Sequence, residues 1–386
     1  MSPESRDELR ADLSLIRNAV EAGVVPSRAA AANSAWNIWQ LFCVSLQADP
    51  FLQCGTDPIL LLQIFAQRYR DGRIAPSGKQ VRSRTVEDAV RAVGQGFTRL
   101  GSPDPRLTSN GKLDFRLQRQ LSGYSKTDPP PNRVKPIPLS IVMCCLALAD
   151  AASTISNCAV ADMICLAFFF LLRPGEYTVG GRNNESSPFK LEDVQLFIGN
   201  QRLAVLSCSD LDLDTATFVS LTFTDQKNAV RGEVIGLGLS GSRDCCPVKA
   251  TVRRVKALRA SGAIGSTPLA AYRTQQGGRL TAVSAANITE ALRIAVAMQG
   301  PTVGFLPEDI SARALRAGGA MALLCAQVDS DLIRLLGRWR SDEMLRYLHV
   351  QAQPVMRNFS RLMLQGGQFS LIPGPEVPNL ENPQAP

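Results

Sequence analysis

The stretch CAVADMICLAFFFLLRPGEY, residues 158–177, contains the longest apolar run of the chain. Only Asp162 interrupts the apolar side chains between Cys158 and Leu172, and the run is shorter than the ~20 residues that a membrane-spanning helix needs. We therefore predict a helix that is buried inside a folded domain. Because proline cannot continue a helix, Arg173 and Glu176 are expected directly beyond its end.

The composition allows a packed core and two or three domains. The chain has 386 residues, of which 45% are hydrophobic and 20% are charged. Its 42 Lys and Arg residues outnumber its 34 Asp and Glu residues, and this excess favours a polyanionic partner such as nucleic acid. Residues 1–20 lack the apolar core of a secretory signal. We expect a protein without a membrane segment, nuclear in a eukaryote and otherwise cytoplasmic.

Cysteine and histidine usage disfavours several kinds of site. The ten cysteines form no C-x-x-C pair, so the sequence suggests neither a zinc site nor a thioredoxin-like motif, and we expect reduced thiols in the core. The single histidine, His349, excludes an H-E-x-x-H zinc site. A Ser-His-Asp triad is possible only if His349 itself serves it.

Proline-rich segments divide the chain into parts. We predict a flexible N-terminal segment at 1–24, a helical domain at 25–125, a proline-rich linker at 126–138, a second domain at 139–365 and a disordered tail at 366–386.

The first domain shows apolar residues at helical spacing, with Ser83 or Thr85 as the possible cap of one helix. Between residues 68 and 99 basic side chains outnumber acidic ones. A solvated face is the ordinary explanation of any one of these charges, but the cluster as a whole favours a phosphate-facing surface. The residues predicted to contact DNA are Arg68, Arg70, Lys79, Arg82, Arg84 and Arg91.

The second domain combines helices with a hairpin. Helical patterns cover 139–152, 157–172 and about 281–364. Between the second and third of these, TFVSLTFT alternates apolar and polar residues as a half-buried strand does, and GEVIGLGL follows a short polar turn. This pattern predicts a β-hairpin with Lys227 at or near its tip. The whole chain is therefore expected to be mainly α with a small β-sheet.

Four segments carry residues that are able to bind or attack a phosphate. They provide Arg173 with Glu176, then Lys227, then Arg313 with Arg316, and finally Arg338, Trp339, Tyr347 and His349. Each has an ordinary explanation when taken singly: an arginine before proline ends a helix, a hairpin lysine faces solvent, and Gly318-Gly319 allows close helix packing. Their common order and spacing favour a single site.

In these motifs the sequence resembles the tyrosine recombinase or phage integrase family, over residues 25–365 and most firmly over 165–350. Arg173-Pro-Gly-Glu176 looks like the family's first arginine box, and Lys227 lies where the family carries its hairpin lysine. Arg316 matches the second arginine.

The resemblance continues toward the C-terminus. Gly337 matches the glycine of the L-G-H/W box, and Tyr347 follows Arg338 at the spacing of the family's nucleophile. LRAGGAMAL and LGRWRSDEMLRYL look most like the versions in eukaryotic mobile elements of the crypton and DIRS kind.

The resemblance implies two domains, a helical SAM-like core-binding domain and a mixed α/β catalytic domain, that close around duplex DNA as a C-shaped clamp. It implies a site-specific recombinase or integrase in which Tyr347 attacks to form a 3′-phosphotyrosine, Arg173 and Arg316 clamp the scissile phosphate, and Lys227 protonates the leaving 5′ oxygen. Members work as homotetramers on paired sites of double-stranded DNA and need no cofactor. Glu176 is expected to hold Arg173, and His349 to be a neighbour of the nucleophile without a role in proton transfer.

Two positions depart from the family pattern. Arg313 stands where the second box usually begins with histidine, and Arg338 stands at the later His/Trp position with Trp339 directly after it. Arginine stabilises phosphate charge but is a poor proton acceptor. Either water or the scissile phosphate takes the proton of Tyr347, or the enzyme is slow. Trp339 could occupy the third position through a local shift, so all three are kept as candidate catalytic residues.

Two rival functions stay open at this point. One is a domesticated recombinase that binds DNA without cutting it, which Arg313 and Arg338 favour. The other is a type IB topoisomerase, which is disfavoured because the chain lacks a long extra capping region. The apolar stripe Val355, Phe359 and Met363 fits either a C-terminal helix packed on a neighbouring protomer or an internal core helix.

Overall fold

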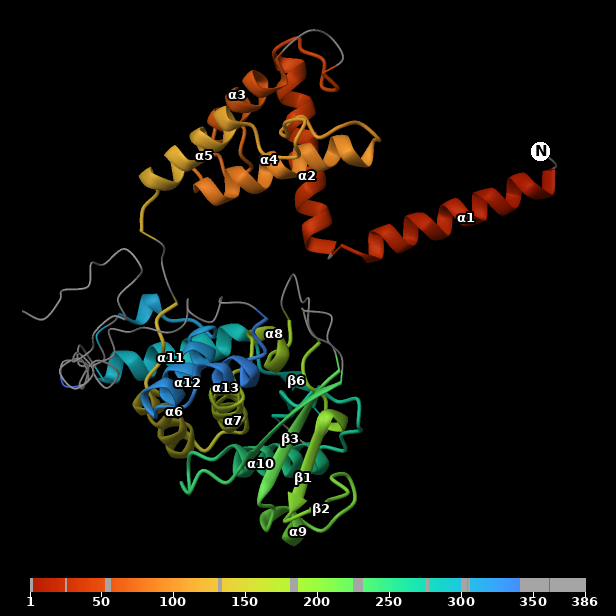
Figure 1. Ribbon diagram of the computed structural model, residues 1–386. Coiled ribbons are helices and arrows are strands. Elements are labelled where there is room, and N and C mark those ends of the chain that lie inside the picture. The colour runs from red at the N-terminus through yellow and green to blue at the C-terminus, as the bar shows by residue number, and fades with distance from the viewer. Residues whose placement is uncertain are drawn as a thin grey trace, which may run out of the picture. The chain divides into compact units, whose positions relative to one another are not determined.

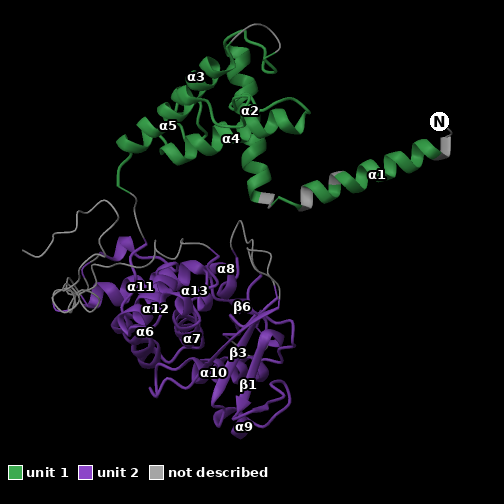
Figure 2. Ribbon diagram, viewed as in Figure 1, with its two compact units in different colours: residues 1–132 green, residues 133–386 purple. Residues whose placement is uncertain are grey.

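The computed structural model describes residues 3–24, 26–52, 57–130, 134–180, 187–224, 232–274, 278–299, 304, 306–340 and 361. The chain divides into two compact units, residues 1–132 and 133–386, each with a hydrophobic core of its own (Figure 2). The division falls inside the segment predicted as the linker. No helix among the described residues is long and apolar enough to cross a membrane.

Unit 1 is built from helices (Figure 1). Aromatic side chains lie in its core. Its helices are α1 (Pro3–Ala22), α2 (Pro26–Ser45), α3 (Pro58–Arg70), α4 (Ser83–Arg99) and α5 (Phe115–Thr127). Trp39 of α2 is fully buried and packs edge-on against Phe65 of α3, and both α2 and α3 contact α4. The core of this small unit also contains the aromatic residues Trp36, Phe42, Tyr69 and Phe97.

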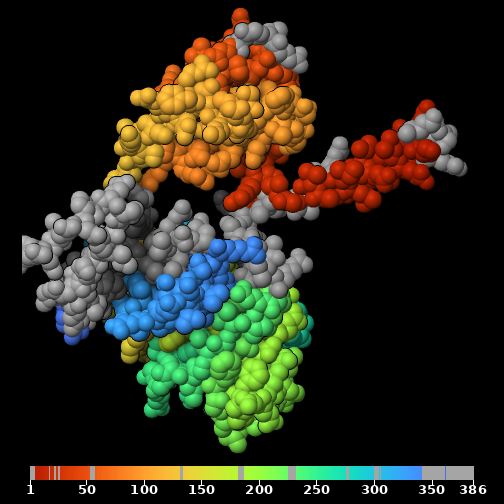
Figure 3. Space-filling model, viewed as in Figure 1, coloured from red at the N-terminus to blue at the C-terminus, as the bar shows by residue number. Residues whose placement is uncertain are grey.

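Helix α1 differs from the prediction, which made residues 1–24 flexible. The segment is helical, with Leu9, Leu13, Ile16 and Val20 at helical spacing. All of its described side chains are exposed (Figure 3). The helix therefore follows from local periodicity and not from burial against the rest of unit 1.

The predicted linker at 126–138 is shortened at both ends. Helix α5 continues to Thr127, and the carboxylate of Asp128 accepts hydrogen bonds from Arg70 and from the backbone and hydroxyl of Ser83. At the other end Ile137 is only 1% exposed and belongs to the core of unit 2. The same contact corrects the predicted cap of α4: its N-cap is Arg82, and the Ser83 N–H binds Asp128 at 2.9 Å.

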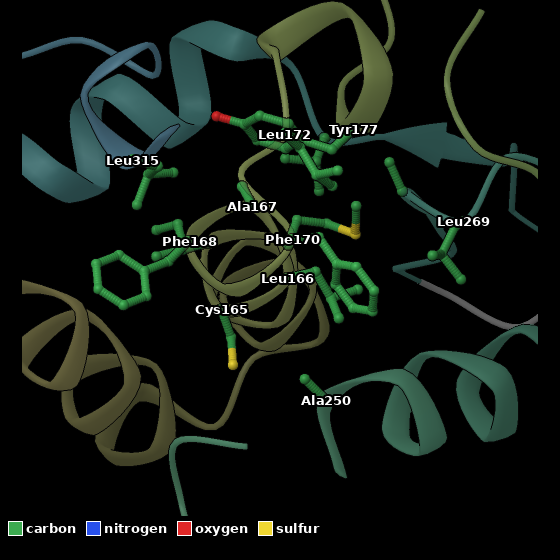
Figure 4. Close-up of a cluster of buried hydrophobic side chains, with 14 of the residues drawn as sticks. Cys165, Leu166, Ala167, Phe168, Phe170, Leu172, Tyr177, Ala250, Leu269 and Leu315 are labelled. Atoms are coloured by element: carbon green, nitrogen blue, oxygen red, sulfur yellow. The ribbon is translucent and has the colours of Figure 1, made fainter. Parts of the chain in front are cut away.

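Unit 2 is organised around α7 (Ile155–Phe169), the helix predicted from the longest apolar run. Figure 4 shows α7 nearly end-on, with labelled side chains such as Cys165, Leu166 and Phe168 pointing outward on different sides. The other helices of the unit are α6 (Leu139–Ala152), α8 (Pro174–Tyr177), α9 (Asp210–Asp214), α10 (Pro247–Ala260), α11 (Ala285–Gln299), α12 (Ala314–Cys325) and α13 (Ser330–Leu336), with short 3₁₀ turns at Leu191–Asp193 and Pro307–Asp309. Helices α6, α10, α11 and α12 all contact α7, which explains why α7 is apolar on all sides.

A small antiparallel sheet completes unit 2. Its strands are β1 (Val194–Ile198), β2 (Gln201–Arg202), β3 (Phe218–Phe223) and β4 (Glu233–Gly238) in the order β2-β1-β3-β4, and a separate pair joins β5 (Ala271–Tyr272) to β6 (Thr281–Ala282). β3 pairs with β4 from Phe223 opposite Glu233 to Phe218 opposite Gly238. The predicted hairpin and the mainly α fold with a small β-sheet are confirmed, while Lys227 lies outside the described residues.

Candidate active site

The site begins where α7 ends. Leu172 donates its N–H to the Ala167 carbonyl at 3.0 Å, and Leu171 between them has a left-handed φ of +50°. This is the ending that helices usually make with glycine, and a leucine there costs about 1–2 kcal/mol. The turn presents the Leu171 carbonyl to two arginines, Arg316 at 2.6 Å and Arg338 at 3.3 Å.

Arg173 and Glu176 form one unit directly after this turn. Glu176 accepts the Arg173 backbone N–H at 2.8 Å through Oε2 and the Arg173 Nη1 at 2.9 Å through Oε1. The Glu176 side chain is 2% exposed, whereas that of Arg173 is 23% exposed. Glu176 therefore holds Arg173 as the spacing suggested, and the Arg173 guanidinium reaches the surface.

Arg338 completes the contacts of Glu176 from a distant helix end. Its Nη2 lies 3.0 Å from Glu176 Oε2, and its Nη1 donates to the carbonyls of Leu336 and Phe170 at 3.1 and 3.3 Å. The guanidinium also stacks on the ring of Phe223 at 3.8 Å. Burial lowers the pKa of the Arg338 guanidinium and the carboxylate of Glu176 opposes that shift, so the side chain stays cationic.

Arg316 is buried on α12 and is bound by both helix ends. Its Nη1 donates to the Leu171 carbonyl, and its Nη2 donates to the carbonyl of Gly337, the C-cap of α13. Its guanidinium carbon lies 4.2 Å from the centre of the Trp339 ring. Cation–π contact with a buried indole is favourable, so the Trp339 ring stabilises the position of the Arg316 guanidinium.

Trp339 is 8% exposed and packs with Leu171, Ala320, Met321 and Ile333. The tyrosine-bearing segment against which it was predicted to pack lies outside the described residues. Among the described residues, Trp339 contacts the guanidinium of Arg316, and this contact assigns it to positioning that arginine.

Glycines allow α12 to approach α7 and the segment before α6. A Cβ on Gly318 would lie 2.3 Å from the Ile137 carbonyl oxygen, and one on Gly319 would lie 2.1 Å from that of Phe168. The glycine pair therefore allows close helix packing, as its ordinary explanation holds. The site requires this packing, because Arg316 on α12 must reach the Leu171 carbonyl at the end of α7.

Arg313 is placed differently from the other arginines. It is the exposed N-cap of α12, and its side chain has no hydrogen-bond or ion-pair partner among the described residues. A cation at a helix N-terminus meets the positive end of the helix dipole, which is unfavourable by about 0.3–1 kcal/mol. An anion bound beside Arg313 would be attracted both by this cation and by the positive end of the helix dipole.

Two contacts that sequence reasoning missed tie the site together. The buried hydroxyl of Tyr177, labelled in Figure 4, donates to the Ala312 carbonyl at 2.9 Å and joins the Arg173 turn to the start of α12. Phe223 is the last residue of β3 and lies under Arg338, so the hairpin reaches the site at the end from which the Lys227 loop starts. The position of Tyr177 directly after Glu176 could have indicated its place in the site. The alternating pattern of β3 predicts only that the Phe223 side chain points inward, and it gives no sign of the contact with Arg338.

Three predicted residues, Lys227, Tyr347 and His349, lie outside the described residues. The structure brings together Arg173, Glu176, Arg316, Arg338 and Trp339. In the part of the chain that is described, no group of three or more His, Cys, Asp or Glu side chains is arranged to hold a metal ion.

The basic residues of unit 1 divide into buried and exposed ones. Arg70 corrects the prediction, because its side chain is buried and bound to Asp128 and to the Val81 carbonyl. Sequence spacing did not reveal this partner, which lies in the segment predicted as the linker.

The other predicted DNA contacts are at least partly accessible. Arg84 and Arg91 lie on α4 and form ion pairs with Glu87 and Asp88 at 2.5–3.5 Å. Arg68 stacks on Phe42, Arg82 donates to the Pro130 carbonyl at 3.2 Å, and Lys79 is exposed.

Comparison with known proteins returned solved structures alone. No family model and no curated protein matches the chain. A Tn1549 transposon integrase in complex with circular intermediate DNA is 14% identical, with a TM-score of 0.44 over 78% of this chain and 84% of that one. The XerH site-specific recombinase bound to its difH substrate is 12% identical (TM-score 0.43, 79% and 71%), and the XerA recombinase is 13% identical (TM-score 0.37, 86% and 98%). The function is argued below from the arginine site.

Proposed function

We propose that this chain is a site-specific recombinase that cuts and rejoins double-stranded DNA through a 3′-phosphotyrosine at Tyr347. The observation that carries the proposal is the convergence of Arg173, Arg316 and Arg338 on the turn after α7, where they share Glu176 and the Leu171 carbonyl. This group of four charged side chains has an excess of positive charge, which suits a phosphate.

In the proposed reaction the Tyr347 oxygen attacks the scissile phosphorus, and the bond from phosphorus to the 5′ oxygen breaks. Lys227 gives a proton to that leaving oxygen, and the proton of Tyr347 goes to water or to the phosphate itself. The partly exposed Arg173 binds a non-bridging oxygen. Rejoining reverses these steps, so the bond energy is conserved and no cofactor is required.

Neighbouring elements support this assignment. The strand that leads to Lys227 ends at Phe223, in contact with Arg338, and Trp339 under Arg316 begins the segment that leads to Tyr347. The exposed Arg313 at the start of α12 adds a further cation. We extend the proposal to a homotetramer on paired DNA sites and to a mobile element of the crypton or DIRS kind, with a nuclear location if the host is a eukaryote.

The test is a covalent adduct on nicked DNA. The full chain is incubated with a pool of nicked duplexes of randomised sequence, in which loss of the short strand beyond the cut traps the intermediate. Wild-type protein is expected to form an adduct, and Tyr347→Phe is expected to bind DNA as well but to form none. An adduct of undiminished yield in Tyr347→Phe would remove Tyr347 from the mechanism.

A second candidate is a DNA-binding protein of the same fold that no longer cuts. It is favoured by Arg338, whose guanidinium is engaged by protein groups at a position where the family carries His or Trp. DNA binding without any adduct from the wild-type chain, under conditions in which its helical units are folded, would select this candidate.

A further inference from the structure

We infer that Arg338 is a positioning residue. By binding one oxygen of Glu176 it prevents this carboxylate from forming two hydrogen bonds with the Arg173 guanidinium, and so leaves Arg173 available to a phosphate. The inference rests on the proposed function and adds a role to it. Its basis is the way in which two arginines divide the two oxygens of one buried carboxylate.

The division is visible in the hydrogen bonds of Glu176. Oε2 accepts Arg338 Nη2 at 3.0 Å and the Arg173 backbone N–H at 2.8 Å, whereas Oε1 accepts Arg173 Nη1 at 2.9 Å. Arginine and carboxylate prefer two parallel hydrogen bonds. Because Oε2 already has two donors, Arg173 is limited to a one-point contact through its side chain.

Arg338 is held in place independently of Glu176. Carbonyls of Phe170, Leu171 and Leu336 accept from its two terminal nitrogens, and Phe223 lies against the face of its guanidinium. The backbone of Arg338 has a φ of +55°. The next residue, Trp339, donates its N–H to the Arg334 carbonyl of α13 at 3.0 Å. Only the five-donor fork of arginine supplies this many contacts in one plane, which histidine or lysine cannot do.

Loss of the charge at position 338 should therefore act through Arg173. In Arg338→Met the buried carboxylate of Glu176 keeps Arg173 as its cationic partner and gains the freedom to bind it at two points. A buried carboxylate that loses one partner is strongly unfavourable, so it competes with the phosphate for Arg173. Neutralising Glu176 in the same protein removes that competitor.

The experiment is a double-mutant cycle of Arg338→Met and Glu176→Gln. Cleavage rates are measured at saturating concentrations of an adduct-forming duplex from the randomised pool, together with the unfolding temperature of each protein. Arg338→Met is expected to lower the rate about 10²-fold, as loss of a phosphate ligand does, and Arg338→Met/Glu176→Gln is expected to recover at least about tenfold. A double variant no faster than Arg338→Met would mean that Arg338 only stabilises the fold, and would overturn the inference.

Arg338→Lys is the charge-conserving comparison, and it decides the question if Arg338→Met does not fold. Its ammonium can still occupy Glu176 but cannot reach the three carbonyls. It should cleave within about tenfold of wild type and gain nothing from Glu176→Gln. A gain of about tenfold or more from Glu176→Gln in Arg338→Lys, or a loss of about 10²-fold in Arg338→Lys alone, would overturn the inference.

A cleavage-independent measurement separates this inference from the proposed function. The same proteins are titrated with inorganic phosphate, and the rise of the unfolding temperature gives the affinity. Arg338→Met should bind phosphate more weakly than wild type, and the added Glu176→Gln should restore binding. Absence of an adduct from wild-type protein would count against recombination alone, whereas equal phosphate affinity in all variants would overturn the role of Arg338.

Discussion

Gly337 shows how a single residue controls the arginine site. A Cβ at this position would lie 1.7 Å from the Trp339 ring, although the backbone φ of −78° is open to any residue. The requirement for glycine is therefore one of space and not of conformation. The Trp339 ring that occupies this space lies 4.2 Å below the Arg316 guanidinium, so the glycine acts on the arginine through the indole.

Gly337→Ala is accordingly expected to displace Trp339, and to cost about 1–3 kcal/mol in the free energy of unfolding of unit 2. Adduct formation should fall with it because Arg316 loses its support. Chemical denaturation with circular dichroism measures the first effect, and the trapped adduct measures the second. Gly238→Ala is a matched control in the same unit, since its Cβ would meet only the Thr217 carbonyl at 3.9 Å. Equal stability of Gly337→Ala and Gly238→Ala would contradict the tight packing of Trp339.

At the scale of elements, the ends of helices make the site. α7 and α13 both end with a left-handed residue that is not glycine, Leu171 and Arg338. The carbonyls left over at these two ends are then taken by Arg316 and Arg338. The last carbonyls of a helix have no intrahelical partners. Where two helix ends meet inside a core, buried arginines can donate the hydrogen bonds that these carbonyls need.

The N-terminus of α4 is satisfied in a corresponding way by Asp128. Burial raises the pKa of this carboxyl, but the hydrogen bonds from Ser83 and Arg70 outweigh it and hold the pKa below its usual range. A depressed folded pKa means that the ionised carboxylate stabilises the folded state at neutral pH. That stabilisation is present above the unfolded pKa of about 3.9 and is lost as the pH falls through the lower folded value.

Asp128→Asn should therefore destabilise unit 1 by about 1–3 kcal/mol at pH 7, and the difference from wild type should shrink below about pH 4. Tryptophan fluorescence in a Trp339→Phe background follows this unit during denaturation, because the two remaining tryptophans, Trp36 and Trp39, lie in its core. Asp12→Asn on the exposed helix α1 is the control and should change stability by less than about 0.5 kcal/mol. A pH-independent difference between wild type and Asp128→Asn would rule out the ionised carboxylate as the source of stability.

At the scale of the whole molecule, each unit has a core of its own, and the connection between them is anchored at both ends. Asp128 belongs to unit 1 through Arg70 and Ser83, while Lys135 pairs with Asp309 at 2.6 Å inside unit 2. Helix α1 contributes no described side chain to either core. The stability of unit 1 should accordingly reside in α2–α5.

Removal of residues 1–24 tests this view. The truncated chain is expected to unfold within about 0.5 kcal/mol of the full chain, because exposed side chains contribute little. Leu62→Ala, at a fully buried position of unit 1, should instead cost about 2–5 kcal/mol. A loss of stability on truncation that grows with protein concentration would mean that α1 packs against another copy.

Much of the fold and part of the site could be predicted from local sequence patterns. The apolar run before Arg173 predicts a buried helix, and strict alternation at Val219, Leu221 and Phe223 predicts a strand whose inward side chains are all buried. The spacing of Arg173 to Glu176 predicts their contact because both lie within one turn of chain. The roles of Lys227 and Tyr347 remain predictions, since both lie outside the described residues.

The sequence by itself determined the buried helix before Arg173, the two strands of the hairpin and which charged residues are candidates for a phosphate, because these properties depend on neighbours within a few residues. Tertiary structure alone decided what each arginine does. Arg70 looked like a surface cation and is buried against Asp128, and Arg338 looked like a phosphate ligand and is bound to Glu176 and three carbonyls. A guanidinium has the same donors in every setting, so its role is set by the acceptors that folding brings to it from distant parts of the chain.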